Sequence, residues 1–253
     1  MSVENVHAVE REKWDGVAGR ERSDDELRLA DADFGAYCRR LATMVGIEEF
    51  LGDLRGRRVL EYGCGMGTIS TLLARSGAQV SAFDISAGSI DVARRRAELH
   101  GVGDRIEFAV TAAEHLPYES GQFDAVVGRA VLHHLDVEQA GPELHRVLRD
   151  GGKGAFAEPI GTNPIIAFAR DHVPYPGKNP RGADVPLSYA DIAAWERPFS
   201  SAHHREVQLL SALGRAVGAK RRLRRLDHAD DWLLQRVPAL KPLCRYVVMT
   251  MTK

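Results

Sequence analysis

Between residues 57 and 157 the chain alternates short apolar runs with segments of helical periodicity. Near-continuous apolar runs of this length are typical of strands that are covered on both faces. When helices join such strands, the result is a parallel sheet with crossover helices on both sides. We therefore predict a doubly wound α/β fold. The predicted strands are residues 58–62, 79–83, 106–110, 123–127 and 154–157, and the predicted helices are residues 69–75, 90–99 and 138–148.

Residues 1–55 carry a helical pattern ahead of this sheet. Ser23 precedes three acidic residues, which is the composition of an N-cap followed by a first turn that complements the helix dipole. Apolar residues from Leu27 to Leu41 then recur at helical spacing. We expect a helical appendage here and no strand.

Seven prolines mark the segment after the last predicted strand, at positions 159, 164, 174, 176, 180, 186 and 198. Proline removes a backbone donor and fixes φ, so this segment is predicted to form neither one helix nor an internal strand. We interpret it as an insertion or lid. Beyond it, residues 206–217 predict a helix, and residues 220–226 and 244–250 predict two further strands.

Charge and cysteine content narrow the classes of partner. The 253 residues include 34 Lys and Arg against 35 Asp and Glu, so no long-range attraction draws the chain to nucleic acid or to an anionic membrane. Cys38, Cys64 and Cys244 are dispersed and are expected to be reduced thiols, and no metal-ligand spacing is found. With a charged start and no long apolar segment, we expect a soluble cytoplasmic protein.

A glycine-rich loop follows the first predicted strand, with Gly63, Gly65 and Gly67 at alternate positions. Glycine allows a tight turn and a close approach of a ligand to the backbone at a helix N-terminus. The wider spacing of a dinucleotide loop and the Lys-Ser/Thr pair of a phosphate-binding loop are both absent. The loop therefore predicts a nucleoside-like ligand without a diphosphate, although a plain strand-to-helix turn would also place glycine here.

Asp84 ends the second predicted strand. A carboxylate at this position can accept hydrogen bonds from both hydroxyls of a ribose, and Ile85 can cover one face of an adenine. The alternative role for Asp84 is that of a carboxylate at the start of the next helix.

The order of the motifs resembles that of class I S-adenosylmethionine-dependent methyltransferases. The resemblance covers residues 57–157 and is carried by the glycine loop, Asp84, the segment 113–118 (Ala-Glu-His-Leu-Pro-Tyr), the strand 123–127 and the segment 148–154 (Leu-Arg-Asp-Gly-Gly-Lys-Gly). It implies a Rossmann-like, mostly parallel seven-stranded sheet that ends in an antiparallel hairpin. It also implies S-adenosyl-L-methionine as the cofactor and a single domain with four parts, which are an N-terminal helical cover (1–55), a cofactor-binding core (56–158), a cap insertion (159–203) and a terminal helix with a strand hairpin (204–253).

The same resemblance implies roles for individual residues. The three glycines would pass under the methionine and ribose of the cofactor, Glu61 would polarise the loop and the amino group, and Asp84 would hold the ribose. Ala113 and Glu114 would meet the adenine edge, and Arg129 would line the methionine end. Many relatives carry an acidic residue at the place of Ala112, so Glu114 or a backbone carbonyl must replace that contact here.

Candidate residues for the chemistry follow the fourth and fifth strands, at the edge where open α/β sheets bind ligands. His133 is the candidate base for an acceptor that must lose a proton, and His134 and Glu158 are candidate substrate residues. The histidines could instead only shape the pocket, and Glu158 could be a surface carboxylate. Trp14 is a candidate plug over the site or an apolar anchor of the first helix.

These features predict a methyltransferase for a small, apolar or aromatic metabolite, with O-, C- or N-methylation left open. Two alternatives are kept. The first is a module that binds S-adenosylmethionine without catalysis, and the second is a nicotinamide-dependent oxidoreductase, which would want a different glycine spacing. No nucleic acid and no membrane are expected as partners, and a homo-oligomer is left open.

Overall fold

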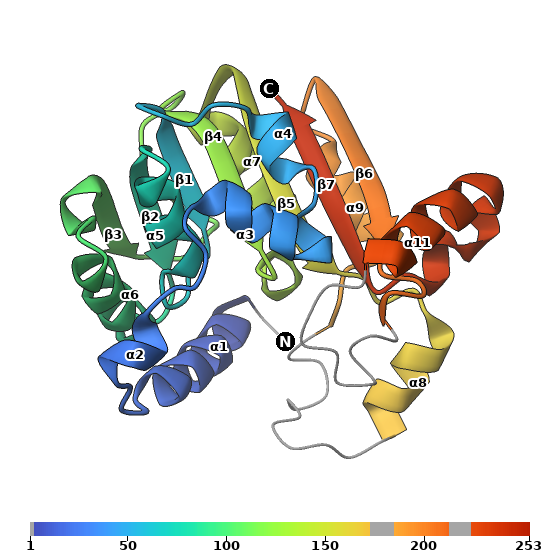
Figure 1. Ribbon diagram of the computed structural model, residues 1–253, viewed down its shortest axis with the longest axis horizontal. Coiled ribbons are helices and arrows are strands. Elements are labelled where there is room, and N and C mark those ends of the chain that lie inside the picture. The colour runs from blue at the N-terminus through green and yellow to red at the C-terminus, as the bar shows by residue number, and fades with distance from the viewer. Residues whose placement is uncertain (1–2, 173–184, 213–223) are drawn as a thin grey trace.

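The computed structural model describes residues 3–172, 185–212 and 224–253 and contains one seven-stranded sheet (Figure 1). The strand order is β3-β2-β1-β4-β5-β7-β6. Strands β1 to β5 are parallel, and β7 pairs antiparallel with both β5 and β6. The predicted doubly wound sheet with a terminal hairpin is thereby confirmed. The strands are β1 (Arg58–Tyr62), β2 (Gln79–Asp84), β3 (Ile106–Val110), β4 (Phe123–Arg129), β5 (Leu148–Pro159), β6 (Ser201–Val207) and β7 (Tyr246–Thr252).

Helices cover both faces of the sheet, so each strand contributes to two cores. Val59 belongs to the core under α3, α4 and α5, whereas Leu60 and Tyr62 belong to the core under α7 and α9. This division follows from the alternation of side chains along a strand. Within the described ranges, the helices of four or more residues are α1 (Val3–Ala18), α2 (Asp24–Leu27), α3 (Phe34–Arg40), α4 (Ile47–Leu51), α5 (Thr68–Arg75), α6 (Ala87–Leu99), α7 (Val137–Val147), α8 (Pro164–His172), α9 (Tyr189–Glu196) and α11 (Arg224–Arg236), with a six-residue 3-10 helix at Pro238–Leu243.

The N-terminal segment is helical, but the continuous pattern from Leu27 to Leu41 is broken. Ser23 is the N-cap of α2 and forms a capping box with Glu26, as its position predicted. Helix α2 ends after one turn, and Asp33 starts α3 afresh by accepting a hydrogen bond from the backbone N–H of Ala36. The N-caps Ser23 and Asp33 thus begin two separate helices, although the apolar periodicity between Leu27 and Leu41 had predicted a continuous helical pattern.

The proline-rich segment differs from the prediction of a separate cap. Residues 173–184 lie outside the described part of the chain. After them, α9 returns to the sheet, and its Ile192 and Trp195 are fully buried against Tyr62 and Phe156. Pro186 and Pro198 flank α9 and do not interrupt it. A regular helix therefore covers the sheet here, which the proline content of the segment had not led us to expect.

The last two strands are only partly where the sequence placed them. The edge strand is β6 (Ser201–Val207), whereas the predicted helix began at residue 206 and the predicted strand lay at residues 220–226. Residues 224–226 instead begin α11, and residues 213–223 lie outside the described ranges. Pairing with β7 makes a strand of the polar sequence at 203–206, because an edge strand needs only one partner and tolerates exposed polar side chains.

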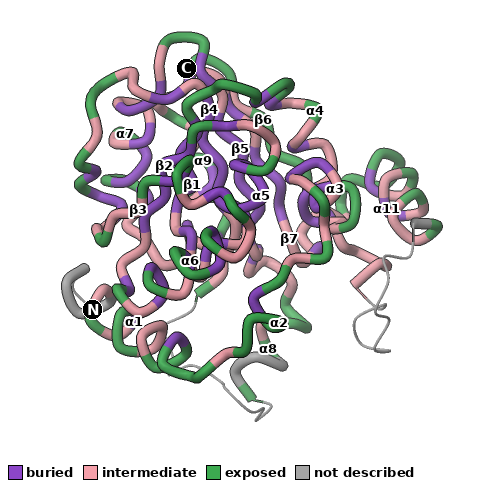
Figure 2. The backbone as a smooth tube through the Cα atoms, turned by 60° about the vertical axis from the view of Figure 1, so that its left-hand side comes forward, coloured by how far each residue is buried: buried purple, intermediate pink, exposed green. Residues whose placement is uncertain are grey.

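Burial is concentrated in the sheet and in the helix faces that cover it, while α8 and α11 project from the body (Figure 2). Helix α1 lies beside α6 at the edge of the sheet where the parallel strands end (Figure 1). Among the described helices, none combines the length and the apolar character that a membrane span requires.

Candidate active site

The glycine loop joins β1 to α5 with three residues in the left-handed region. The φ angles of Gly63, Gly65 and Gly67 are 68°, 49° and 73°. A Cβ added at Gly63 would lie 2.3 Å from Val131, and one at Gly67 would lie 2.7 Å from Ala93. A Cβ at Gly65 would meet no protein atom within 4 Å. Gly63 and Gly67 therefore serve packing, while the space beside Gly65 is open.

Asp84 braces this loop from the end of β2. Its Oδ2 accepts from the backbone N–H of Gly65 at 2.8 Å, and its Oδ1 accepts from that of Ser86 at 3.0 Å. Burial raises the pKa of Asp84, although these backbone donors act in the opposite direction. The carboxylate of Asp84 therefore contacts both the start of the next helix, at Ser86, and the glycine loop, at Gly65.

A cavity of about 620 Å³ opens at the carboxyl edge of the sheet beside this loop. Gly67, Glu114 and Glu158 do not line it. Most of the predicted site residues do, namely Trp14, Glu61, Gly63, Gly65, Asp84, Ile85, Ala113, Arg129, His133 and His134. The described residues of the segment 159–203 contribute nothing to this wall.

Glu61 is the most strongly perturbed acid in the cavity wall. It is buried, and its Oε2 has no hydrogen-bond partner. Burial raises the pKa of Glu61 to about 8. Arg129 also lines the cavity, and its Nε is buried without a hydrogen-bond partner. These two groups can satisfy a ligand that carries both an ammonium and a carboxylate.

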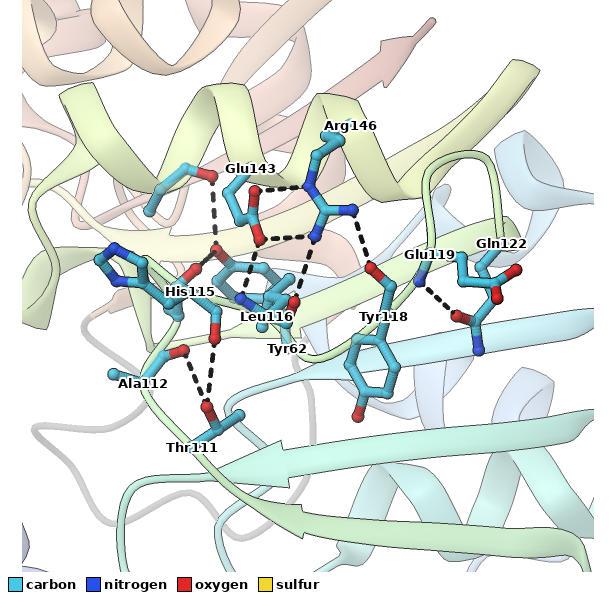
Figure 3. Close-up of polar contacts among 12 residues, drawn as sticks. Tyr62, Thr111, Ala112, His115, Leu116, Tyr118, Glu119, Gln122, Glu143 and Arg146 are labelled. Atoms are coloured by element: carbon cyan, nitrogen blue, oxygen red, sulfur yellow. Dashed lines mark hydrogen bonds and ion pairs between the residues drawn. The ribbon is translucent and has the colours of Figure 1, made fainter.

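The segment 111–118, whose first three residues line the cavity, is held from behind (Figure 3). The hydroxyl of Tyr62 donates to the carbonyl of Ala113 at 3.0 Å. Glu143 accepts from the backbone N–H of Leu116 and pairs with Arg146, which donates to the carbonyls of Leu116 and Tyr118 (Figure 3). Tyr62, Glu143 and Arg146 fix the shape of the predicted adenine side without touching the cavity.

Glu114 points away from that side. Its Oε1 lies 3.2 Å from Nε2 of His7 in α1 and accepts from the backbone N–H of Asp136 at 3.4 Å. The expectation that Glu114 replaces the acidic residue missing at Ala112 is thus not supported by its geometry, because its carboxylate joins α1 to the body.

Helix α1 supplies one wall of the cavity. Its Asp15 accepts from the hydroxyl of Ser86 and from the backbone N–H of Gly88, which anchors the end of α1 on the start of α6. Its His7, Glu10, Lys13 and Trp14 line the cavity. Of these, the sequence indicated only Trp14. The other three resemble the solvated face of a helix, so no pattern in the sequence separates them from surface residues.

Glu158 and His133 form a buried pair at the end of β4 and β5. Glu158 is fully buried and accepts from the backbone N–H of Val131 at 2.8 Å through Oε1. Its Oε2 lies 2.8 Å from Nδ1 of His133. A carboxylate only accepts, so Nδ1 carries the proton and Nε2 is the basic nitrogen. Glu158 was expected to face the cleft; it lies behind His133 and orients it.

Arg96 is a site residue that the sequence did not reveal. From α6, its guanidinium donates to the carbonyl of Leu27 at 3.1 Å, to the carbonyl of Met66 and to the hydroxyl of Thr68 at 3.2 Å. Burial lowers the pKa of Arg96. The residue therefore links α2, α6 and the glycine loop, and it also lines the cavity.

The apolar and aromatic side chains of the predicted cover were expected to favour an apolar or aromatic acceptor; they are Trp14, Phe34, Tyr37, Ile165, Ile166, Phe168 and Tyr175. Of those that the structure describes, Trp14 and Tyr37 line the cavity and the others do not. Ile165, Ile166 and Phe168 lie on α8 and are exposed by 75%, 38% and 64%. Tyr175 lies outside the described residues. The end of the cavity near α1 is instead lined by charged and polar side chains, which argues against a purely apolar acceptor.

Known proteins resemble the chain over its sheet-forming half. Residues 60–156 match the family described as a methyltransferase domain. Methyltransferase GfsG of Streptomyces halstedii is 39% identical over 118 residues, which are 45% of this chain and 42% of that protein. A ubiquinone biosynthesis O-methyltransferase of Xanthomonas oryzae pv. oryzae is 35% identical over 153 residues, 57% of this chain and 62% of that protein. The chain thus spans less than two thirds of the length of the curated relatives it matches.

The fold is also found in solved structures at low sequence identity. The geranyl diphosphate C-methyltransferase of Streptomyces coelicolor A3(2), solved with S-adenosyl-L-homocysteine, superposes with a TM-score of 0.61 at 15% identity. That likeness covers 96% of this chain and 97% of the other. At this identity it establishes the fold, which agrees with the predicted Rossmann-like sheet.

Proposed function

We propose that residues 60–156, which match the family described as a methyltransferase domain, belong to a class I S-adenosylmethionine-dependent methyltransferase, and that the chain transfers a methyl group from S-adenosylmethionine to a hydroxyl of a small-molecule acceptor. The observation that carries the choice of a hydroxyl is the hydrogen bond between His133, which lines the cavity, and the buried Glu158 behind it. A hydroxyl must lose its proton when it is methylated, and an oriented imidazole is suited to take it.

The residues of the cavity fit the cofactor. The unpartnered Oε2 of Glu61 suits an ammonium, and the unpartnered Nε of Arg129 suits a carboxylate. Asp84 reaches the cavity from the strand end at which a ribose is held in related folds. Ile85 and Ala113 offer apolar surface for a base. When bound, S-adenosylmethionine supplies an electrophilic methyl group on a sulfonium.

The protein's own part in the reaction is proton removal and alignment. Glu158 holds the proton on Nδ1 of His133, and we assign to Nε2 the role of taking the proton of the acceptor hydroxyl as its oxygen attacks. Glu158 also stabilises the imidazolium that results. Helix α1, whose His7, Glu10, Lys13 and Trp14 line the cavity, would keep water from the reacting groups and hold the acceptor in line.

Methyl transfer is tested by incubating the purified chain with methyl-labelled S-adenosylmethionine and hydroxylated acceptors, among them catechol and phenol, and by following labelled product. We expect labelled ether products. A calorimetric titration with S-adenosylhomocysteine against NAD separates this function from an oxidoreductase. Tight binding of S-adenosylhomocysteine without transfer to any acceptor would favour the non-catalytic module instead.

Replacing Asp84 by alanine should weaken S-adenosylmethionine binding by about 5- to 150-fold, which corresponds to the usual loss of about 1–3 kcal/mol for a buried hydrogen-bonded carboxylate. Asp84→Asn should lose less, because its amide oxygen still accepts from Gly65. Asp104→Ala, at an exposed carboxylate, is the control. Unchanged affinity in a folded Asp84→Ala protein would contradict the ribose assignment.

Binding of S-adenosylhomocysteine at pH 7 should release about one proton. In the free protein Glu61, with its pKa raised to about 8, is mostly protonated at this pH. The ligand's ammonium favours the carboxylate, so the pKa falls on binding and the proton leaves. Calorimetry in two buffers of different ionisation enthalpy measures this release. Glu61→Gln should abolish it, and equal heats in both buffers for the wild type would refute the assignment.

A further inference from the structure

One part of the cavity wall remains unexplained by the cofactor and by the His133–Glu158 pair. Glu10 of α1 is 4% exposed and lines the cavity. Its Oε2 accepts from Nε1 of Trp14 at 2.9 Å and lies 3.7 Å from Nζ of Lys13. Its Oε1 has no hydrogen-bond partner. A buried carboxylate oxygen without a donor is costly, so this atom calls for a ligand group.

A second unsatisfied atom lies next to it. Nδ1 of His134 is buried without a hydrogen-bond partner and is 3.3 Å from Oε1 of Glu10, within ion-pair distance but without hydrogen-bond geometry. Burial raises the pKa of Glu10, but His134, Lys13 and Trp14 outweigh it, so the pKa lies below its ordinary value. The carboxylate is therefore ionised near neutral pH, and its charge favours the tautomer of His134 with the proton on Nδ1.

The two atoms together select one kind of group. Oε1 of Glu10 needs a donor, and Nδ1–H of His134 needs an acceptor. A hydroxyl does both at once, whereas a carbonyl leaves Glu10 unsatisfied and an ammonium leaves His134 unsatisfied. The rings of His134 and His133 are 3.9 Å apart between centroids, so a group bound here lies close to the hydroxyl that His133 would deprotonate.

We propose that Glu10 and His134 bind a second hydroxyl of the acceptor, adjacent to the hydroxyl that is methylated. The acceptor class is then a molecule with two neighbouring hydroxyls, such as an ortho-diphenol. This inference rests on the proposed function, because it places the second hydroxyl relative to His133. It also gives α1 a role in acceptor choice, through a residue that recognises the hydroxyl and takes no part in proton transfer.

Calorimetric titration of the protein loaded with S-adenosylhomocysteine, with catechol and with phenol, tests the proposal. The wild type should bind catechol about 10- to 100-fold more tightly than phenol, as expected for a hydrogen bond to a charged group. Glu10→Gln should reduce this preference to about threefold or less, since a neutral amide accepts more weakly. Glu12→Gln, the same change at an exposed position of α1, should preserve it.

The possible results distinguish a failure of the proposed subsite from a failure of the proposed methyltransferase function. Equal binding of the two probes by the wild type, no binding of either, or an equal loss for both probes in Glu10→Gln would overturn the subsite. Retained affinity for S-adenosylhomocysteine shows that Glu10→Gln has folded. A protein that prefers catechol through Glu10 but forms no methyl ether would keep the subsite and contradict the methyltransferase function.

Discussion

Replacement of His133 by glutamine should lower kcat by about 10²- to 10⁴-fold, the contribution of a positioned general base. The affinity for S-adenosylhomocysteine should stay within about threefold, because the change removes a proton acceptor and no group assigned to the cofactor. The measurement is steady-state methyl transfer with a hydroxylated acceptor, paired with calorimetry. His145→Gln, on the outer side of α7 against Phe199, is the matched control and should retain full activity.

Glu158→Gln distinguishes a base from a residue that only shapes the pocket. The amide has a single oxygen, so it keeps only one of the two contacts that the carboxylate makes with the N–H of Val131 and Nδ1–H of His133, and it no longer stabilises an imidazolium by charge. We expect a loss in kcat of about 10- to 100-fold and a shift of the acid limb of the pH–rate profile to lower pH. Partial recovery in Glu158→Asp would support orientation of His133. A His133→Gln enzyme with wild-type kcat would remove the base from the mechanism.

The sheet was predictable where burial alone decides structure. Strands β1 to β4 begin at the predicted residues Arg58, Gln79, Ile106 and Phe123. The central strands β1 and β4 are largely buried, and burial on both faces favours the apolar runs by which they were recognised. The terminal strands were not. The strand β6 is polar at His203, His204 and Arg205, and only its pairing with β7 makes it a strand. Local composition cannot report a pairing partner that is 39 residues away in the sequence, as Tyr246 is from Val207.

The site residues show the same difference between positions that local sequence determines and positions that depend on distant parts of the chain. Residues at strand ends and in the glycine loop were found because backbone geometry demands them there, as the positive φ of Gly63 and Gly65 shows. Glu10, Arg96 and the orienting role of Glu158 depend on helices and strands that meet only after folding. A charged residue that is buried across an interface has the same local pattern as one on a solvated face.

The glycine loop gives the prediction with the largest effect on cofactor binding. Gly65→Val should reduce the affinity for S-adenosylhomocysteine by more than about 100-fold. The new side chain would meet no protein atom within 4 Å, and Gly65 lines the cavity, so we expect the branched side chain to occupy space that the ligand needs. The φ of 49° also strains a β-branched residue by about 1–2 kcal/mol. Calorimetry measures the affinity, and thermal unfolding measures the strain.

Strain and exclusion can be separated with a second glycine. Gly101, in the turn after α6, has a φ of 65° and likewise has no protein atom within 4 Å of an added Cβ, but it does not line the cavity. Gly101→Val should therefore lose about as much stability as Gly65→Val and bind S-adenosylhomocysteine as the wild type does. If both variants lose affinity equally, backbone strain transmitted through the fold explains the effect. If Gly65→Val binds normally, the ligand does not pass over this loop, and the placement of the cofactor along Gly63, Gly65 and Asp84 is wrong.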